Sequence, residues 1–244
     1  MAKVVIISGA GISAESGIST FRDSDGLWEN HKVEDVCTLG CLKTNREETV
    51  TFYDGLRVAL EDKKPNRAHL QIAQLKEKYK EQIAIITQNV DNLFEKAGIP
   101  HEDVIHLHGY MTDLECESCG HVYNAGYQRT IEVFEGSCPK CHSDQIRPFI
   151  VMFGEAAPKY QELYQSFDDC EMMVVIGTSG YVINTDMYLS PKIKKSILNN
   201  LVPSNALNDE LYSKVLYKPA TEAIDEIARE INAFLSDAVF KELL

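Results

Sequence analysis

Short runs of consecutive apolar residues recur along the chain, separated by longer amphipathic segments. The apolar runs predict strands at Val4–Ser8, Ile83–Thr87, Met172–Gly177, Ser196–Asn200 and Lys214–Tyr217. The amphipathic segments predict helices at Glu47–Leu60, Arg67–Glu77, Val90–Ala97, Lys159–Ser166 and Ala220–Leu235. Strands that are apolar on both faces are covered by helices on both sides, so we expect an α/β fold built on a parallel sheet.

This pattern is interrupted between Tyr110 and Arg147. Strand signals shorten there, cysteines cluster, and glycines and a proline break the segment repeatedly. The α/β pattern then resumes. We therefore expect residues 1–109 and 148–244 to form one larger domain and residues 110–147 to form a small inserted module.

Four cysteines in the insert have the spacing of a zinc site. Two C-x-x-C pairs lie 18 residues apart: Cys116 with Cys119, and Cys138 with Cys141. Each pair places two thiolates on one tight turn, and four thiolates leave no coordination position open. We predict a structural zinc ion. The other three cysteines are expected to be free thiols without an assigned role: Cys37, Cys41 and Cys170.

A glycine turn follows the first predicted strand. Gly9 and Gly11 begin the pattern G-x-G-x-x-A, which in dinucleotide-binding proteins lets the backbone and a following helix N-terminus approach a pyrophosphate. A tight turn without a ligand is the alternative. No second strand ending in an acid follows, which disfavours a hydride-transfer enzyme. The polar loop that follows carries Phe21, Arg22 and Trp28, and we expect it to fold over a bound dinucleotide.

Polar side chains follow the predicted strand Ile83–Thr87. Gln88, Asn89 and Asp91 would stand in the crevice where open α/β sheets bind ligands, although an Asn or Asp there also caps helices. Further on, alternation places His106 and His108 on one face of a strand. Either could be a structural histidine, but one at the mouth of a crevice can take a proton from a hydroxyl.

Composition narrows the classes of partner. The 244 residues carry 24 Lys and Arg against 37 Asp and Glu, a formal charge of −13, with 44% hydrophobic residues. An acidic protein repels phosphate backbones, so neither nucleic acid nor an anionic membrane is expected as a partner. No apolar stretch is long enough to span a bilayer and no secretory leader is evident. We expect a cytoplasmic protein, with a monomer favoured.

Several motifs together resemble the sirtuin family in content and order. They are GAGISAESGISTFR at 9–22, TQNVD at 87–91, HLHG at 106–109, the paired C-x-x-C, RPFIVMFGE at 147–155 and GTS at 177–179. The resemblance, to bacterial-type members, implies a Rossmann-like domain, a small zinc-binding domain and NAD-dependent deacylation of protein lysine. The acyl group would pass from lysine to ADP-ribose, with release of nicotinamide. An ADP-ribosyltransferase and a non-catalytic NAD or ADP-ribose sensor remain the alternatives.

The resemblance also implies a role for individual residues, with His108 as the catalytic base. The residues that would bind NAD are Gly9, Ala10, Gly11, Thr20, Phe21, Arg22, Trp28, Gln88, Asn89, Asp91, Gly177, Thr178, Ser179, Asn200 and Ala220. An acyl-lysine peptide would add as a strand along residues 151–155. The substrate residues would be Tyr53, Val151, Met152, Phe153, Gly154 and Glu155.

Some positions depart from the family pattern. Met152 stands where a tryptophan is usual, and Val202 where a glutamate is frequent. The chain most resembles the desuccinylase-like branch, but it lacks that branch's Tyr-x-x-Arg pair, because Tyr53 is followed by Leu56 and then Arg57. One residue is about 100° of helix rotation, so Arg57 would point away from Tyr53. We expect neutral acyl groups to be preferred, with desuccinylation left open. The plainer alternative is that Leu56 packs the pocket and Arg57 is a solvated charge.

Overall fold

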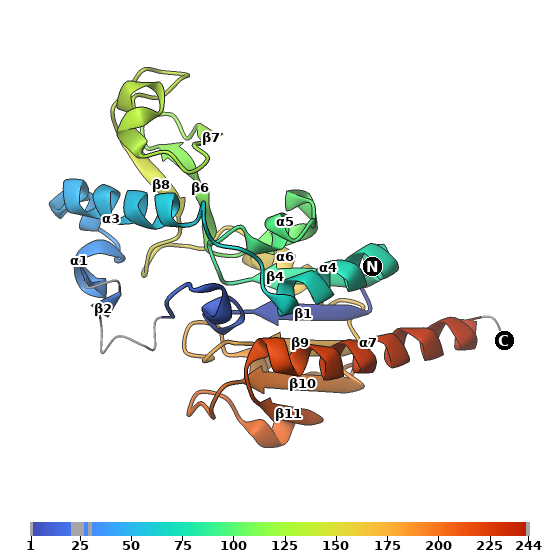
Figure 1. The fold of residues 1–244 in the computed structure, drawn as a ribbon. Helices are drawn as coiled ribbons and strands as arrows, with labels where there is room; N and C mark the ends of the chain where they lie inside the picture. Colours follow the sequence, from blue (N-terminus) through green and yellow to red (C-terminus); the bar gives the residue numbers. More distant parts are fainter. Residues whose placement is uncertain (1, 21–26, 29–30, 243–244) are drawn as a thin grey trace.

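The centre of the molecule is a six-stranded parallel sheet in the order β11-β10-β9-β1-β4-β5 (Figure 1). It is seen in a computed structural model that describes residues 2–20, 27–28 and 31–242. The strands of this sheet are β1 (Val4–Ser8), β4 (Ile83–Thr87), β5 (Val104–His106), β9 (Met172–Ile176), β10 (Lys195–Asn200) and β11 (Lys214–Tyr217). The five strands predicted from apolar runs are confirmed, with ends that differ by at most one residue.

The consecutive apolar residues are explained by burial on both faces of the sheet. Every residue of β1 and β9 is buried. Alternate side chains pack against α4 and α7 on one face, and the intervening ones pack against Leu163 of α6 on the other. The parallel α/β architecture expected from the sequence is therefore confirmed.

Seven α-helices lie in the described ranges, and none of them has the length and apolarity needed to cross a lipid bilayer. They are α1 (Val33–Val36), α2 (Cys41–Thr44), α3 (Arg46–Ala59), α4 (Arg67–Tyr79), α5 (Leu93–Lys96), α6 (Tyr160–Ser166) and α7 (Ala220–Glu242). The prediction that a helix begins at Val90 is wrong. The Val90 carbonyl accepts the Met111 amide at 2.8 Å and is not part of a helical ladder. The helix begins at Leu93, whose amide donates to the Asp91 carboxylate at 3.1 Å.

A three-stranded antiparallel sheet stands apart from the main sheet, in the order β7-β6-β8. In Figure 1 it rises above the main sheet, and α3 crosses beside its base. A small core that includes Cys116 and Cys138 packs beneath it. Its strands are β6 (Gly109–Cys116), β7 (Val122–Asn124) and β8 (Ile146–Ile150), and a two-stranded hairpin consists of β2 (Leu27–Trp28) and β3 (His31–Lys32).

Arg57 of α3 joins that helix to the small sheet. Its guanidinium is fully buried and forms an ion pair with Asp54, and its Nε donates to the Met111 carbonyl, 2.8 Å away. Asp54 in turn accepts the amide and hydroxyl of Thr130, at 2.9 and 2.7 Å. The interpretation of Arg57 as a solvated charge is therefore wrong. It lies outside the cavity that Tyr53 lines, as the helix rotation predicts.

Candidate active site

A cavity of about 1330 Å³ opens where β1, β4, β9 and β10 end beside α3 and the small sheet. Residues from distant parts of the chain line it. All the predicted NAD and peptide residues that can be placed are among them: Gly9, Ala10, Gly11, Thr20, Tyr53, Gln88, Asn89, Asp91, His108, Val151, Met152, Phe153, Gly154, Glu155, Gly177, Thr178, Ser179, Asn200 and Ala220. Phe21 and Arg22 lie outside the described residues, as does the side chain of Trp28.

The glycine turn at the floor of the cavity is packed against the segment that follows β9. The Gly11 amide donates to the Gly177 carbonyl at 2.9 Å. A Cβ on Gly11 would lie 2.7 Å from the Gly177 Cα, and Gly177 itself has a φ of +67°. Glycine is therefore required at both positions. Two 3₁₀ turns, Ala10–Ile12 and Ala14–Ser16, form the turn and the residues after it, and no α-helix follows directly.

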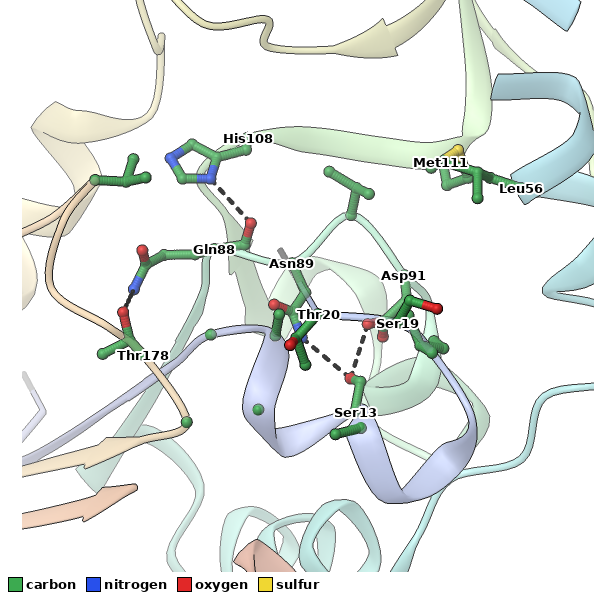
Figure 2. A pocket seen from close by; sticks show the side chains of 18 of the residues that line it. Ser13, Ser19, Thr20, Leu56, Gln88, Asn89, Asp91, His108, Met111 and Thr178 are labelled. Carbon is green, nitrogen blue, oxygen red and sulfur yellow. Dashed lines mark hydrogen bonds between the residues drawn. The ribbon is translucent and has the colours of Figure 1, made fainter. Parts of the chain in front are cut away.

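Ser13 connects the glycine turn to the polar residues after β4 (Figure 2). Its hydroxyl donates to Asp91 Oδ2 at 2.8 Å and accepts a hydrogen bond from Asn89 Nδ2 at 3.0 Å. Burial raises the pKa of Asp91, while its hydrogen bonds oppose the rise. Asp91 thus accepts the first amide of α5 with one oxygen and holds Ser13 with the other, although the N-cap position itself is Asn92.

His108 is held in one tautomer by the backbone. Its Nδ1 lies 2.9 Å from the Gln88 carbonyl, and a carbonyl oxygen only accepts, so Nδ1 carries the proton. Burial lowers the pKa of His108, although the Gln88 carbonyl opposes this. The neutral ring therefore has Nε2 available as a proton acceptor. In Figure 2 the ring stands beside Gln88 at the cavity.

The prediction that His106 and His108 share one face of a strand is wrong. β5 ends at His106, and His108 lies in the turn that follows. His106 is buried against Glu95, with its Nε2 2.7 Å from the carboxylate, away from the main cavity. The turn forms because the chain reverses into β6 at Gly109, where φ is +91° and the Phe149 carbonyl would meet a Cβ at 2.1 Å.

At the end of β10, the cavity is lined by a hydrogen-bond donor without a partner, which fits a nucleotide. Asn200 ends β10 and is buried, and its Nδ2 has no hydrogen-bond partner among the described residues. Such a buried donor costs free energy until an acceptor arrives. A ribose hydroxyl of NAD would supply one. This orphaned donor and the close glycine turn together fit the bound dinucleotide that the sequence predicts.

The end of the cavity under α3 is apolar. Tyr53 is 2% exposed, and its hydroxyl shares a hydrogen bond with the Cys37 thiol. Met152 is equally buried, with its sulfur 3.2 Å from Cys41 Sγ. Leu56 and Met111 lie side by side at this end (Figure 2). Cys37 and Cys41 are free thiols, as expected; Cys37 lines this end of the cavity, and Cys41 is buried in the adjoining core with Met152.

The segment expected to receive a peptide strand is already paired on one side. The Phe153 amide donates to the Cys37 carbonyl at 2.8 Å, and its carbonyl accepts from Leu39 at 2.8 Å. Glu155 holds Arg147 through two hydrogen bonds, at 2.8 and 2.9 Å, and also accepts the Met152 amide. An added strand would therefore meet the opposite side.

A buried histidine that the sequence did not single out lies next to Ser13. His69 of α4 lies with Nε2 3.5 Å from Ser13 Oγ and Nδ1 3.1 Å from Asn66 Oδ1. Burial lowers its pKa to about 4, so the ring is neutral. Asn66 could have been read as the N-cap of α4, since it follows Pro65 and its side chain accepts the Ala68 amide. The contact with Ser13 has no local signal.

The four cysteines of the insert converge as predicted. Their sulfurs lie within 4.8 Å of one another. Cys116 and Cys141 are 3.6 Å apart, and Cys119 and Cys138 are 3.7 Å apart. Zinc at about 2.3 Å from four tetrahedral sulfurs holds them about 3.8 Å apart, so the cluster is compatible with a structural zinc ion.

Cys138→Ser should therefore remove zinc and loosen the small sheet. A serine hydroxyl is a poor replacement for a thiolate ligand, and metal binding supplies folding free energy at such sites. We expect loss of zinc by elemental analysis and faster amide hydrogen exchange in residues 110–147. Cys170→Ser, at a buried cysteine outside the cluster, is the matched control and should keep its zinc. Retained zinc in Cys138→Ser would contradict the assignment.

Comparison with known proteins gives a consistent set of relatives. A model described as "Sir2 family" matches residues 9–184. An "NAD-dependent protein deacylase" of Campylobacter jejuni strain RM1221 is 44% identical over 97% of this chain and 99% of its own. A protein of the same description from Helicobacter hepaticus is 38% identical over 96% and 99%. One from Escherichia coli K12 is 35% identical over 94% and 82%.

Solved structures of similar shape include ligand complexes. One, described as a Sir2 homologue in complex with NAD, matches with a TM-score of 0.80 and 30% identity, covering 95% of this chain and 90% of that one. Another, described as Sir2Tm bound to a propionylated peptide, has a TM-score of 0.76 and 27% identity, covering 94% and 93%.

Proposed function

The chain belongs to the Sir2 family and is an NAD-dependent protein deacylase, and we propose that its main cavity is where NAD and an acyl-lysine segment react. One observation carries this proposal. Residues from five of the six sequence motifs, at 9–22, 87–91, 106–109, 147–155 and 177–179, line a single cavity. The alternatives, ADP-ribosyl transfer and a non-catalytic sensor, become outcomes of the experiment described below.

His108 is the proposed base. When bound, NAD supplies an activated ribose carbon with nicotinamide as its leaving group. His108 Nε2 accepts the proton of a ribose hydroxyl, because the Gln88 carbonyl keeps the other ring nitrogen protonated. Asn89 and Asp91, both held by Ser13, orient the nicotinamide ribose.

The peptide is proposed to add beside Gly154. The amide and carbonyl of Gly154 have no backbone partner in the described part of the chain, whereas those of its neighbour Phe153 are paired with Cys37 and Leu39. Main-chain pairing tolerates varied sequences, and the charge of −13 favours segments rich in lysine.

Two coarser proposals concern organisation and location. We propose residues 110–147 as the zinc-binding module and residues 1–109 and 148–244 as the NAD-binding domain. None of the seven cysteines, all of them in the described part of the chain, forms a disulfide, and we propose a reducing compartment such as the cytoplasm. We propose a monomer there.

The apolar end of the cavity favours neutral acyl groups. The Tyr53 hydroxyl is hydrogen-bonded to Cys37, and Arg57 forms an ion pair with Asp54 outside the cavity. A succinyl carboxylate at Leu56 would be desolvated without a guanidinium to pair with it, which costs several kcal/mol. We therefore expect acetyl-lysine to exceed succinyl-lysine in kcat/KM by at least ~10²-fold.

Leu56→Arg should reduce the preference for acetyl-lysine over succinyl-lysine. The new guanidinium would stand at the cavity end beside Tyr53 and could pair with an acyl carboxylate. We expect desuccinylation to rise at least tenfold, on the order of 1.4 kcal/mol, and deacetylation to fall. Val58→Arg is the matched control, since it adds the same charge at an exposed position of α3 and should change neither rate. If Leu56→Arg gains no desuccinylation, the lack of a guanidinium beside Tyr53 does not set the acyl preference.

The proposed function is tested with acetyl-, succinyl- and longer acyl-lysine peptides, analysed by mass spectrometry with and without NAD. We expect loss of the acyl mass only with NAD, fastest for neutral acyl groups. A mass gain of ADP-ribose on the peptide would indicate transfer to protein instead. Unchanged peptides together with retained NAD binding would indicate a sensor.

A further inference from the structure

A second group of metal-ligating side chains lies outside the main cavity. Glu95 belongs to α5, His101 begins a short 3₁₀ turn, and His106 ends β5. One carboxylate oxygen and one nitrogen from each ring lie within 4.8 Å of one another. The spacing of these residues along the chain matches no motif singled out from the sequence.

The distances are close to those of a coordination sphere. Glu95 Oε1 is 3.3 Å from His101 Nδ1 and 2.7 Å from His106 Nε2. An ion with tetrahedral nitrogen and oxygen ligands at about 2.0–2.1 Å holds them about 3.3 Å apart. The distance from Glu95 Oε1 to His101 Nδ1 already has that value. The distance from Glu95 Oε1 to His106 Nε2 would have to increase by about half an ångström.

Aromatic packing fixes the two imidazole rings. Their planes are 16° apart with centroids 5.3 Å apart. The Tyr110 ring contacts both, at 4.4 Å from His101 and 4.7 Å from His106. Rings held in this way lose little conformational freedom on binding an ion, which favours affinity.

Besides Oε1 of Glu95 and Nε2 of His106, each of these groups carries a second polar atom. Glu95 Oε2 and His106 Nδ1 are buried and have no hydrogen-bond partner in the part of the chain that the structure describes. The side chain of His106 is 2% exposed and that of Glu95 16%, whereas His101 is 49% exposed. The exposed ring leaves a route for an ion from solvent and room for water as a fourth ligand.

We propose that Glu95, His101 and His106 form a second metal site, which takes Zn²⁺ or a related first-row ion and is separate from the four-cysteine zinc. Two imidazoles and one carboxylate suit Zn²⁺, Ni²⁺, Cu²⁺ and Fe²⁺. Zn²⁺ imposes no geometry of its own, so it tolerates the small opening that the His106 arm requires. With three protein ligands, the site is weaker than the closed four-thiolate site and is filled reversibly.

The test titrates Zn²⁺ by calorimetry, and Co²⁺ by visible absorption, into protein that retains its cysteine-bound zinc. We expect one further saturable ion per chain, and a Co²⁺ spectrum without thiolate charge-transfer bands. His101→Ala and Glu95→Gln should each weaken binding by more than the ~10–100-fold that loss of an outer-shell partner causes.

His121→Ala is the matched control, because His121 lies outside the cluster and its loss should leave the titration unchanged. His101 is half exposed, so its replacement should not disturb folding even if a change at the more buried Glu95 does. The proposal is overturned if no ion binds beyond the cysteine zinc, or if binding is the same in His101→Ala and in the unaltered protein. A hydrogen-bonded cluster without metal would then be the correct description.

Discussion

Replacing His108 with asparagine should slow NAD-dependent deacylation by about 10²–10⁴-fold, the range that a positioned general base contributes. Asparagine keeps an N–H that can donate to the Gln88 carbonyl, but it offers no basic nitrogen toward the ribose hydroxyl. The cavity keeps its shape, so NAD binding should persist. The measurement pairs initial rates on an acetyl-lysine peptide with NAD binding by calorimetry.

His121→Asn serves as the control, since it makes the same chemical change just before β7, at a residue that does not line the cavity. It should leave the rate within twofold. If His108→Asn kept the full rate, the proton would have to leave by another group, and the role given to His108 would be wrong. A joint loss of rate and NAD binding would instead indicate damage to the cavity.

Arg57→Leu should lower the free energy of unfolding by about 3–5 kcal/mol, because it leaves the Asp54 carboxylate buried without its cation. The exposed fractions of the two side chains are 0% and 8%. The substitution also removes the donor to the Met111 carbonyl that joins α3 to β6. Chemical denaturation of the zinc-loaded protein measures the change.

The chain provides a matched control for burial. Arg67 and Asp225 form an ion pair of the same chemistry, with side chains 63% and 43% exposed. Exposed pairs contribute little, so Arg67→Leu should cost less than about 1 kcal/mol. If the two variants lost equal free energy of unfolding, burial would not increase the contribution of the Arg57–Asp54 pair to stability.

The main sheet was predictable because its signal is local. In β1, β4 and β9, four or five consecutive apolar residues bounded by polar turns can be buried on both sides only in the middle of a layered fold. The positions of Gln88 and Asn89 were predictable for a related reason. In parallel sheets the carboxyl ends of neighbouring strands share one edge, so residues that follow different strands meet there.

What the sequence did not reveal depends on partners far apart in the chain. Arg57 looks like a surface charge until Thr130 and Gln128 are brought beside it by the small sheet. The contact of His69 with Ser13 likewise joins residues 56 positions apart. The early end of β5 at His106 reflects close packing of Gly109 against Phe149, which no local pattern encodes.

We propose that the main cavity transfers the acyl group from lysine to ADP-ribose derived from NAD. The most direct measurement follows three products together in one reaction with an acetyl-lysine peptide: nicotinamide, free-lysine peptide and O-acetyl-ADP-ribose. We predict that they appear at equal rates and in equal amounts, and that all three fall together in His108→Asn. Deacetylated peptide formed without nicotinamide, or acetate released with no acetylated ADP-ribose at any time, would contradict the account.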